Sequence, residues 1–420
     1  MPIDTDRLYT GQFFRMFAAV ALFMAAVGLQ FHFGEYVAYL GHGVDTLGHL
    51  LSASTVGTLL IRLQLGRWID RFGYRPTWAG GTLVVAIVLA SIQFVERLWV
   101  IAALRTVSAM ATAGVMTTVA VFAAQIAPAG RRAESIGSMG LAGFLGMIIG
   151  PTLGDWIFSG KGDPLTAHHI FFTASAVFSL LAGGLMMLAP APAALQRFDL
   201  PLTAPRGSGG GASGAPVSMF RVIIAHWPGS ILLVGVVFSM VFCLQIAFIE
   251  RLADQRGFND VKAFFLVYCP TAMVLRIIFR RVPERIGRSR TLVGGLLVQA
   301  AGLVCLVGVE HESGLALPAL LMGTGHCFVF PSMVDLSAER LPPQHRGIGT
   351  SLIMGAGDVG MLTGFFFLGE VIDRFGFDAA LYGLATVILG GAAVFAVTRR
   401  VDVFRPRLRR LEGRRAGGNT

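Results

Sequence analysis

The sequence predicts an all-α membrane protein in which twelve transmembrane helices form two pseudo-symmetric six-helix bundles. The first observation behind this fold class is composition: of 420 residues, 54% are hydrophobic and only 14% are charged, which is more apolar surface than one or two soluble cores can bury. A bilayer core about 30 Å thick needs roughly 20 apolar residues per helix, so this length accommodates on the order of twelve spans. The other two observations are the spacing of the apolar segments and an internal repeat.

Six apolar segments of spanning length make up a first bundle within residues 1–189. They lie at 14–39, 46–66, 77–95, 98–125, 135–158 and 168–189. Residues 190–227 are rich in proline, glycine and serine, so we expect a flexible cytoplasmic linker that holds no packed core. A second bundle is expected within residues 228–398, followed by a basic cytoplasmic tail at 399–420. Its six segments lie at 228–250, 261–281, 291–309, 314–338, 347–369 and 378–398.

The distribution of lysine and arginine predicts the orientation, because basic residues near helix ends are retained on the cytoplasmic side. When both termini are placed inside, few basic residues fall in the outer loops. They are Arg97, Lys161, Arg251, Arg256, Lys262 and Arg374. We therefore expect an integral protein of a bacterial-type inner (plasma) membrane with both termini in the cytoplasm. The basic tail fits the same rule, and binding of anionic lipids is an alternative role for it.

Several function classes are disfavoured by the same composition. The net charge of +10 does not indicate a nucleic-acid partner, because the basic residues are scattered between apolar runs. The four cysteines lie inside apolar segments without CxxC spacing, which argues against a disulfide framework and a zinc site. The spans contain no HExxH and no paired catalytic carboxylates, and the chain contains no ATP-binding loop. We expect neither an enzyme nor a bound metal or cofactor.

An internal repeat relates the two halves of the chain. A shift of 214 residues pairs Arg62 with Arg276, Asp70 with Glu284, Arg71 with Arg285, Gly73 with Gly287, Gly143 with Gly357, Gly146 with Gly360 and Gly150 with Gly364. A shift of 215 pairs Gln30 with Gln245 and Glu35 with Glu250. Two parallel six-helix repeats describe a secondary-transporter architecture, with a substrate site near the membrane midplane where the halves meet.

The stretch "GRWIDRFGYR" at 66–75 resembles the loop signature of the major facilitator superfamily. The matching residues are Gly66, Asp70, Arg71, Gly73 and Arg75, while Tyr74 stands where a basic residue is common. The resemblance implies a conformational latch, in which the aspartate engages the start of the eleventh span near Gly349–Ser351. The second copy contains Glu284 and Arg285 but has Arg280 at the glycine position, so we expect a weaker latch there. A loop that only sets the topology is the alternative.

The fifth predicted span carries "GMIIGPTLG", with Gly146, Gly150, Pro151 and Gly154. Small residues at four-residue spacing let two helices approach closely, and proline bends a helix by removing a backbone hydrogen bond. Within the superfamily, the pattern resembles that of proton-coupled exporters, especially the drug and sugar efflux permeases. Generic helix packing is the alternative explanation.

Ionisable side chains inside spans are costly unless they are paired or face water, so each is a candidate for proton coupling or substrate binding. We predict Asp358, near the middle of the eleventh span, as the leading proton carrier, with a structural ion pair to Arg105 or Arg62 as the alternative. Arg105 is also a candidate counter-charge for the substrate. We expect the repeat mates Arg62 and Arg276 to extend toward the cytoplasmic headgroups.

Four further side chains are weaker candidates. Glu35 and Glu250 lie at the outer ends of the first and seventh spans and are candidates for an outer gate or a proton entry point, or else are ordinary interfacial carboxylates. His32 and His326 lie within spans and are able to titrate near neutral pH, although hydrogen bonding between helices is the alternative role.

Together these features predict a monomeric secondary active transporter that exports a small organic compound in exchange for protons by alternating access. Proton-coupled uptake of a sugar or organic anion is the first alternative, because the same fold supports both directions. A non-transporting membrane partner or sensor is the second, and the charges within the spans argue against it.

Overall fold

The computed structural model describes residues 8–126, 132–159, 163–188, 227–279, 282–339, 341 and 346–416. Within these ranges the regular secondary structure is helical, without strands. Ten of the described helical segments are long and apolar enough to cross a membrane. The predicted all-helical membrane fold is therefore confirmed, and helices occupy the apolar segments that the sequence marks.

The helices of the first half begin and end at residues suited to those positions. The Thr10 hydroxyl accepts a hydrogen bond from the backbone N–H of Phe13 at 3.3 Å and caps the first helix. Gly73, with φ of +81°, separates the third helix from the fourth, since this backbone region favours glycine. The elements are α1 (Gly11–Leu29), η1 (Gln30–His32), α2 (Phe33–Tyr39), α3 (Val44–Phe72), α4 (Tyr74–Ile92), α5 (Leu98–Ile126), α6 (Arg132–Phe158) and α7 (Pro164–Met187).

The second half contains several short helices and one long, broken helix. Its elements are α9 (Ile231–Cys243), η3 (Leu244–Phe248), α10 (Ile249–Gln255), α11 (Lys262–Ile278), α12 (Val282–Ile286), α13 (Arg288–Val307), η4 (Glu312–Leu315), α14 (Ala316–Glu339) and α15 (Arg346–Ala416). The α11 helix has 17 residues. The α15 helix is interrupted at Gly376, where φ is 83° and ψ is 172°. This break falls between the predicted segments 347–369 and 378–398.

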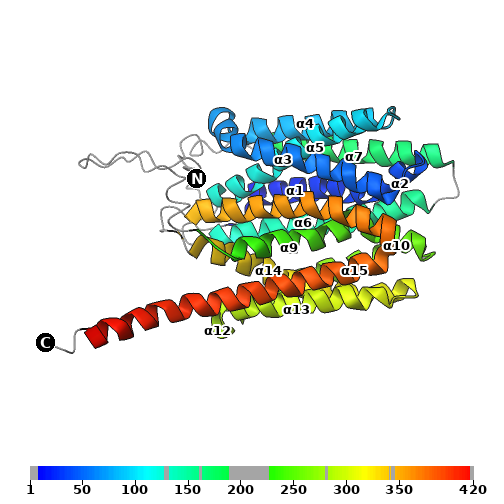
Figure 1. Ribbon diagram of the computed structural model, residues 1–420. Helices are drawn as coiled ribbons and strands as arrows, with labels where there is room; N and C mark the ends of the chain where they lie inside the picture. Colours follow the sequence, from blue (N-terminus) through cyan, green and yellow to red (C-terminus); the bar gives the residue numbers. More distant parts are fainter. Residues whose placement is uncertain are drawn as a thin grey trace.

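Helices of each half pack largely against one another. In the first half, α1 contacts α6 and α7, and α4 contacts α5 and α7; in the second, α9 contacts α15, and α14 contacts α11 and α13. The halves meet where α3 contacts α15 and where α6 contacts α11. Figure 1 shows α2 and α10 at one end of the bundle and α12 toward the other. We call the end with α2 and α10 the outer end, after the predicted topology.

The first helices of both halves leave α-helical geometry at the same point of the internal repeat. Gln30 begins a 3₁₀ turn, η1, and Gln245 lies in a π-helical turn, η3. Such irregular turns re-aim the side chains that follow them and occur often at functional sites. In the first half the irregular turn contains His32, and in the second half it ends two residues before Glu250.

The glycines of "GMIIGPTLG" form the face of α6 on which α1 lies. A Cβ atom at Gly146 would lie 2.6 Å from a backbone oxygen of α1, and one at Gly150 would lie 2.6 Å from Cα of Gly28. A Cβ atom at Gly154 would lie 2.5 Å from Nδ1 of His32. Because all three separations are too short for a side chain, these glycines set the close approach of the two helices. The last of them also places the His32 ring against α6.

Gly150→Ala is expected to destabilise the protein by roughly 1–3 kcal/mol, because the added methyl group collides with the α1 backbone and the helices must move apart. The measurement is the thermal midpoint of unfolding in detergent. Gly184→Ala in α7 is the matched control, since a Cβ atom there meets nothing within 4 Å. Equal midpoints for both variants would contradict this account of the α1–α6 contact.

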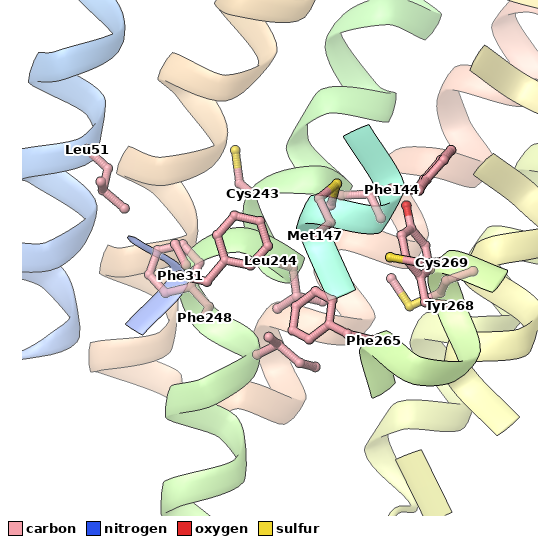
Figure 2. Close-up of a cluster of buried hydrophobic side chains, with 14 of the residues drawn as sticks. Phe31, Leu51, Phe144, Met147, Cys243, Leu244, Phe248, Phe265, Tyr268 and Cys269 are labelled. Atoms are coloured by element: carbon pink, nitrogen blue, oxygen red, sulfur yellow. The ribbon is translucent and has the colours of Figure 1, made fainter. Parts of the chain in front are cut away.

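Buried apolar side chains from both halves meet between the halves. The Phe31 and Phe265 rings have centroids 5.5 Å apart and come from η1 and α11. Figure 2 shows them in one cluster with Leu51, Phe144 and Met147 of the first half and with Cys243, Leu244, Phe248, Tyr268 and Cys269 of the second. The interface between the halves is therefore packed in this conformation, and polar groups near it lie in an apolar environment.

Candidate functional site

A buried cluster of three ionisable side chains joins the halves near the outer end. His32 Nε2 lies 3.2 Å from Asp155 Oδ1 and 2.5 Å from Glu250 Oε1. Relative exposure is 1% for His32, 8% for Asp155 and 9% for Glu250. The backbone N–H of Val261 also donates to Asp155 Oδ1 at 3.4 Å. The first half thus contributes the histidine and the aspartate, and the second contributes the glutamate and the N–H group.

The local fold fixes the histidine of this cluster. Gly154 of α6 leaves room for the ring, and Asp155 is the next residue on the same helix. Phe158, one turn later, stacks on His32 with ring centroids 5.7 Å apart and an interplanar angle of 8°. The ring is therefore held between an aromatic face and two carboxylates.

A small acidic vestibule lies in front of the cluster. The cavity measures about 130 Å³. Carboxylates line it from both halves: Glu35, Asp155, Glu250, Asp254 and Asp260. Such a concentration of negative charge raises the local concentration of cations, protons included. The vestibule gives the buried cluster a route to the outer end of the molecule.

The cluster has polar atoms available to bind a further cation. Within the described ranges, His32 Nδ1, Asp155 Oδ2 and Glu250 Oε2 are buried and have no hydrogen-bond partner. One ligand atom from each residue lies within 4.8 Å of the others, a spacing that also allows a metal ion to be held. Even with His32 protonated, two carboxylates share one positive charge. A further proton on either carboxylate would make the cluster neutral.

Other contacts close the outer end around this cluster. Arg251 Nη1 of α10 lies 3.5 Å from Glu35 Oε1 of α2, and it also donates to Asp254 at 3.1 Å. The Ser52 hydroxyl of α3 donates to the carbonyl oxygen of Leu362 in α15 at 3.0 Å. Glu35 and Glu250, the repeat mates predicted as gate candidates, therefore both make contacts between the halves.

Asp358 is paired with an arginine of the opposite half. Arg62 donates from Nε to Asp358 Oδ2 and from Nη2 to Asp358 Oδ1, the second at 2.9 Å. The two bonds form a bidentate pair, which is the strong geometry for arginine and carboxylate. Arg62 therefore does not extend to the headgroups as the sequence suggested, because a carboxylate on the facing helix binds its guanidinium.

Arg105 lies elsewhere in the first half. Its Nη1 donates to Gln30 Oε1 at 2.8 Å, and Gln30 Nε2 in turn donates to the Ser175 hydroxyl at 2.9 Å. The guanidinium carbon lies 4.3 Å from the centroid of the Phe33 ring. The structure thus places Arg105 on an amide and an aromatic face, apart from Asp358.

His326 lies in an aromatic pocket of the second half. The Tyr268 hydroxyl and His326 Nδ1 are 2.5 Å apart, and both side chains are buried. Phe330 stacks on the imidazole at 5.8 Å between centroids. This hydrogen bond joins α11 to α14, which is the alternative role expected of the histidine.

The predicted latch is visible only in part. The backbone of Gly66 and Asp70 is helical, but their side-chain surroundings lie outside the described part of the structure, as do residues 342–345 before α15. Arg71 is exposed, and Gly73 has the positive φ already noted. Arg75 Nη2 donates to the carbonyl oxygen of Met187 at 2.7 Å, within the first half. In the second copy, Glu284 and Arg285 are exposed.

Sequence reasoning missed Asp155. Its position directly after Gly154 was a usable signal, because it is an acidic residue inside a predicted span and adjoins a helix-packing motif. That it meets His32 and Glu250 follows only from the way η1, α6 and α10 converge.

Comparisons with known proteins identify the family and the fold. The Major Facilitator Superfamily profile matches residues 8–282 and 261–416. The chain is 24% identical over 408 residues to the MFS-type transporter STM4428 of Salmonella typhimurium, covering 94% of this chain and 95% of the relative. It is 25% identical over 404 residues to multidrug resistance protein MdtG of Dickeya zeae, covering 92% and 93%. Its fold is similar to that of the nucleoside transporter NupG, with a TM-score of 0.71 at 14% identity, covering 92% of this chain and 99% of NupG.

Proposed function

The chain belongs to the major facilitator superfamily, and from this membership we propose that it is a secondary active transporter that exports a small organic compound in exchange for protons. It is an integral membrane transport protein and not an enzyme. The name of MdtG, a multidrug resistance protein matched over nearly the whole chain, supports the outward direction. The glycine motif of α6 supports it independently.

The observation that carries the proposal is the buried His32–Asp155–Glu250 cluster between the halves. Closing the outer end buries two carboxylates beside one imidazole, and burial of an uncompensated charge costs several kcal/mol. A proton taken up through the acidic vestibule neutralises the cluster and permits closure. The proton-loaded protein then changes to the inward-facing state, and substrate binding inside is coupled to release of the proton.

The other polar groups have supporting roles in this proposal. We assign the Arg62–Asp358 pair to the joining of α3 and α15, with proton transfer at Asp358 as the alternative that the variants below distinguish. Arg105 and His326 are candidates for contact with substrate. The latch residues Gly66, Asp70, Arg71, Gly73 and Arg75, with Glu284 and Arg285, are proposed to stabilise one of the two states at the inner end.

We further propose twelve spans in two bundles. The described helices agree with that number if α11 crosses the membrane and α15 crosses it twice, turning at Gly376. The bundles are residues 1–189 and 228–398, joined by the linker 190–227 and followed by the tail 399–420. Both termini then lie in the cytoplasm, where the basic tail is available to anionic lipids, and the protein acts as a monomer.

The proposed direction is tested in everted membrane vesicles from cells that express the protein. Acidification of the vesicle interior is expected to drive accumulation of a probe from the panel of ethidium, norfloxacin and nalidixic acid. Addition of that probe is expected to dissipate the pH gradient, reported by a fluorescent amine. Accumulation without proton movement contradicts the exchange mechanism, and expulsion of probe from acidified vesicles indicates proton-coupled uptake instead.

A further inference from the structure

Arg276 of α11 presents the same guanidinium edge as its repeat mate Arg62, but no carboxylate among the described residues pairs with it. Arg62 uses Nε and Nη2 to bind both oxygens of Asp358. In Arg276, Nε and Nη2 are buried and make no hydrogen bond to any residue that the structure describes. These two N–H groups form the fork that binds a carboxylate in bidentate geometry.

The internal repeat explains why Nε and Nη2 of Arg276 have no carboxylate partner among the described residues. The 214-residue shift that pairs Arg62 with Arg276 also pairs Asp358 with Phe144. The guanidinium carbon of Arg276 indeed lies 5.7 Å from the centroid of the Phe144 ring. The arginine of the pseudo-symmetric pair is therefore kept in the second half, whereas its carboxylate partner is replaced by an aromatic ring.

Aromatic rings of α6 and α14 lie beside this guanidinium, and Tyr268 of α11 lies on the imidazole that both rings contact. Phe330 of α14 lies 5.9 Å from the guanidinium carbon of Arg276 and stacks on His326. Phe144 contacts the same imidazole at 5.5 Å between centroids, and Tyr268 of α11 holds it by the hydrogen bond described above. Figure 2 shows the Tyr268 hydroxyl directed toward the side of the cluster that carries Phe144. The surroundings suit an aromatic or other apolar body.

The facing surface of α6 leaves room beside the guanidinium. A Cβ atom at Gly140 would meet only Arg276 Nη1, at 3.8 Å, and one at Gly143 would meet only Met24, at 4.0 Å. Because α6 belongs to the first half and α11 to the second, a ligand at this point contacts both halves. Contact with both halves is what alternating access requires of a substrate.

We propose that Arg276 binds the carboxylate of the transported compound, and that this compound is an organic anion with an aromatic or similarly apolar body. The inference rests on the proposed transport function and assigns the substrate class to it. The carboxylate takes the position that Asp358 occupies at Arg62, while the body lies against Phe144 and Phe330. Arg105 differs, because its guanidinium already donates to Gln30.

The test is equilibrium binding of 2-naphthoate to the purified full-length protein in detergent, with neutral 2-naphthamide as the matched ligand. The wild type is expected to bind the carboxylate about 10-fold or more tightly than the amide, since hydrogen bonds to a charged group strengthen the contact. Arg276→Gln is expected to weaken naphthoate binding by about 10- to 100-fold and to leave weak amide binding unchanged.

A second variant tests the site while keeping the arginine. Phe144→Asp places a carboxylate at the position that corresponds to Asp358. The new carboxylate should pair with the Arg276 guanidinium and abolish naphthoate binding. Phe144→Leu is the matched control, which removes the ring without adding charge and is expected to weaken binding much less. Thermal midpoints of all variants identify any that are unfolded.

Three results would overturn the assignment: a wild type that binds neither probe, equal binding of both probes, or naphthoate binding that persists in folded Arg276→Gln and Phe144→Asp. These binding measurements need no proton gradient, so their outcome is independent of the outcome of the vesicle assay. Selective binding of naphthoate without proton-coupled movement in vesicles would support the substrate class and contradict the exchange mechanism.

Discussion

Glu250→Gln is expected to abolish accumulation driven by a pH gradient while sparing movement of the same probe down its own gradient. Glutamine has the shape of the protonated carboxyl group but cannot exchange a proton. The remaining His32 and Asp155 form a neutral cluster, so the outer end closes whether or not a proton is present. Transport then proceeds without coupling. Proteoliposomes assayed with the panel compound that the wild type moves fastest provide the measurement.

Glu35→Gln is the matched control for this variant. Glu35 is the repeat mate of Glu250 and also lines the vestibule, but it contacts Arg251 and lies outside the buried cluster. It is expected to retain most of the gradient-driven accumulation. If Glu250→Gln accumulates probe as the wild type does, or if both variants lose accumulation equally, the cluster is not the site of coupling.

Asp358→Asn is expected to lower the free energy of unfolding by about 3 kcal/mol, because it leaves the guanidinium of Arg62 without its bidentate partner between α3 and α15. The value is toward the lower end for buried pairs, since 33% of the Arg62 side chain is exposed. Thermal unfolding in detergent measures the loss. Both gradient-driven accumulation and downhill exchange are expected to fall together, because the interface between the halves is weakened.

The double variant Arg62→Gln/Asp358→Asn separates a structural pair from a proton carrier. Removal of both charges eliminates the uncompensated guanidinium, so most of the stability and part of the transport should return. A proton carrier behaves differently: Asp358→Asn then loses gradient-driven transport alone, keeps exchange and stability, and is not rescued by Arg62→Gln. That second pattern would return Asp358 to the role first predicted for it.

The helices were predictable because apolar length and turn residues determine them locally. The segment 14–39 became α1, η1 and α2, ending at Tyr39 as expected. The sequence also placed the division between the last two segments close to Gly376, whose positive φ makes the break. The irregular turns at Gln30 and Gln245 were not predicted, because a 3₁₀ or π turn differs from an α-helix by a single hydrogen-bond shift and leaves no hydropathy signal.

The site was predictable only residue by residue. His32 and Glu250 were identified as costly polar groups, but their contact depends on how two distant helices pack. Asp358 was identified together with Arg62 as one alternative partner. That no described carboxylate pairs with Arg276 becomes meaningful only when the bidentate Arg62 pair is seen. The register of the repeat shows that Arg62 corresponds to Arg276 and Asp358 to Phe144. Only the structure shows that Arg62 and Asp358 form an ion pair, whereas Arg276 lies beside an aromatic ring.

The central claim is that proton occupancy of the His32–Asp155–Glu250 cluster controls closure of the outer end. The direct measurement is the distance between spin labels at Phe94→Cys and Phe375→Cys in a cysteine-free background, since both positions are exposed near the outer end of opposite halves. In the wild type, the distance should be short in acidic buffer and longer in alkaline buffer, whereas in Glu250→Gln it should be short in both. A wild-type distance that ignores pH, or a Glu250→Gln distance that follows pH as the wild type does, would contradict the account.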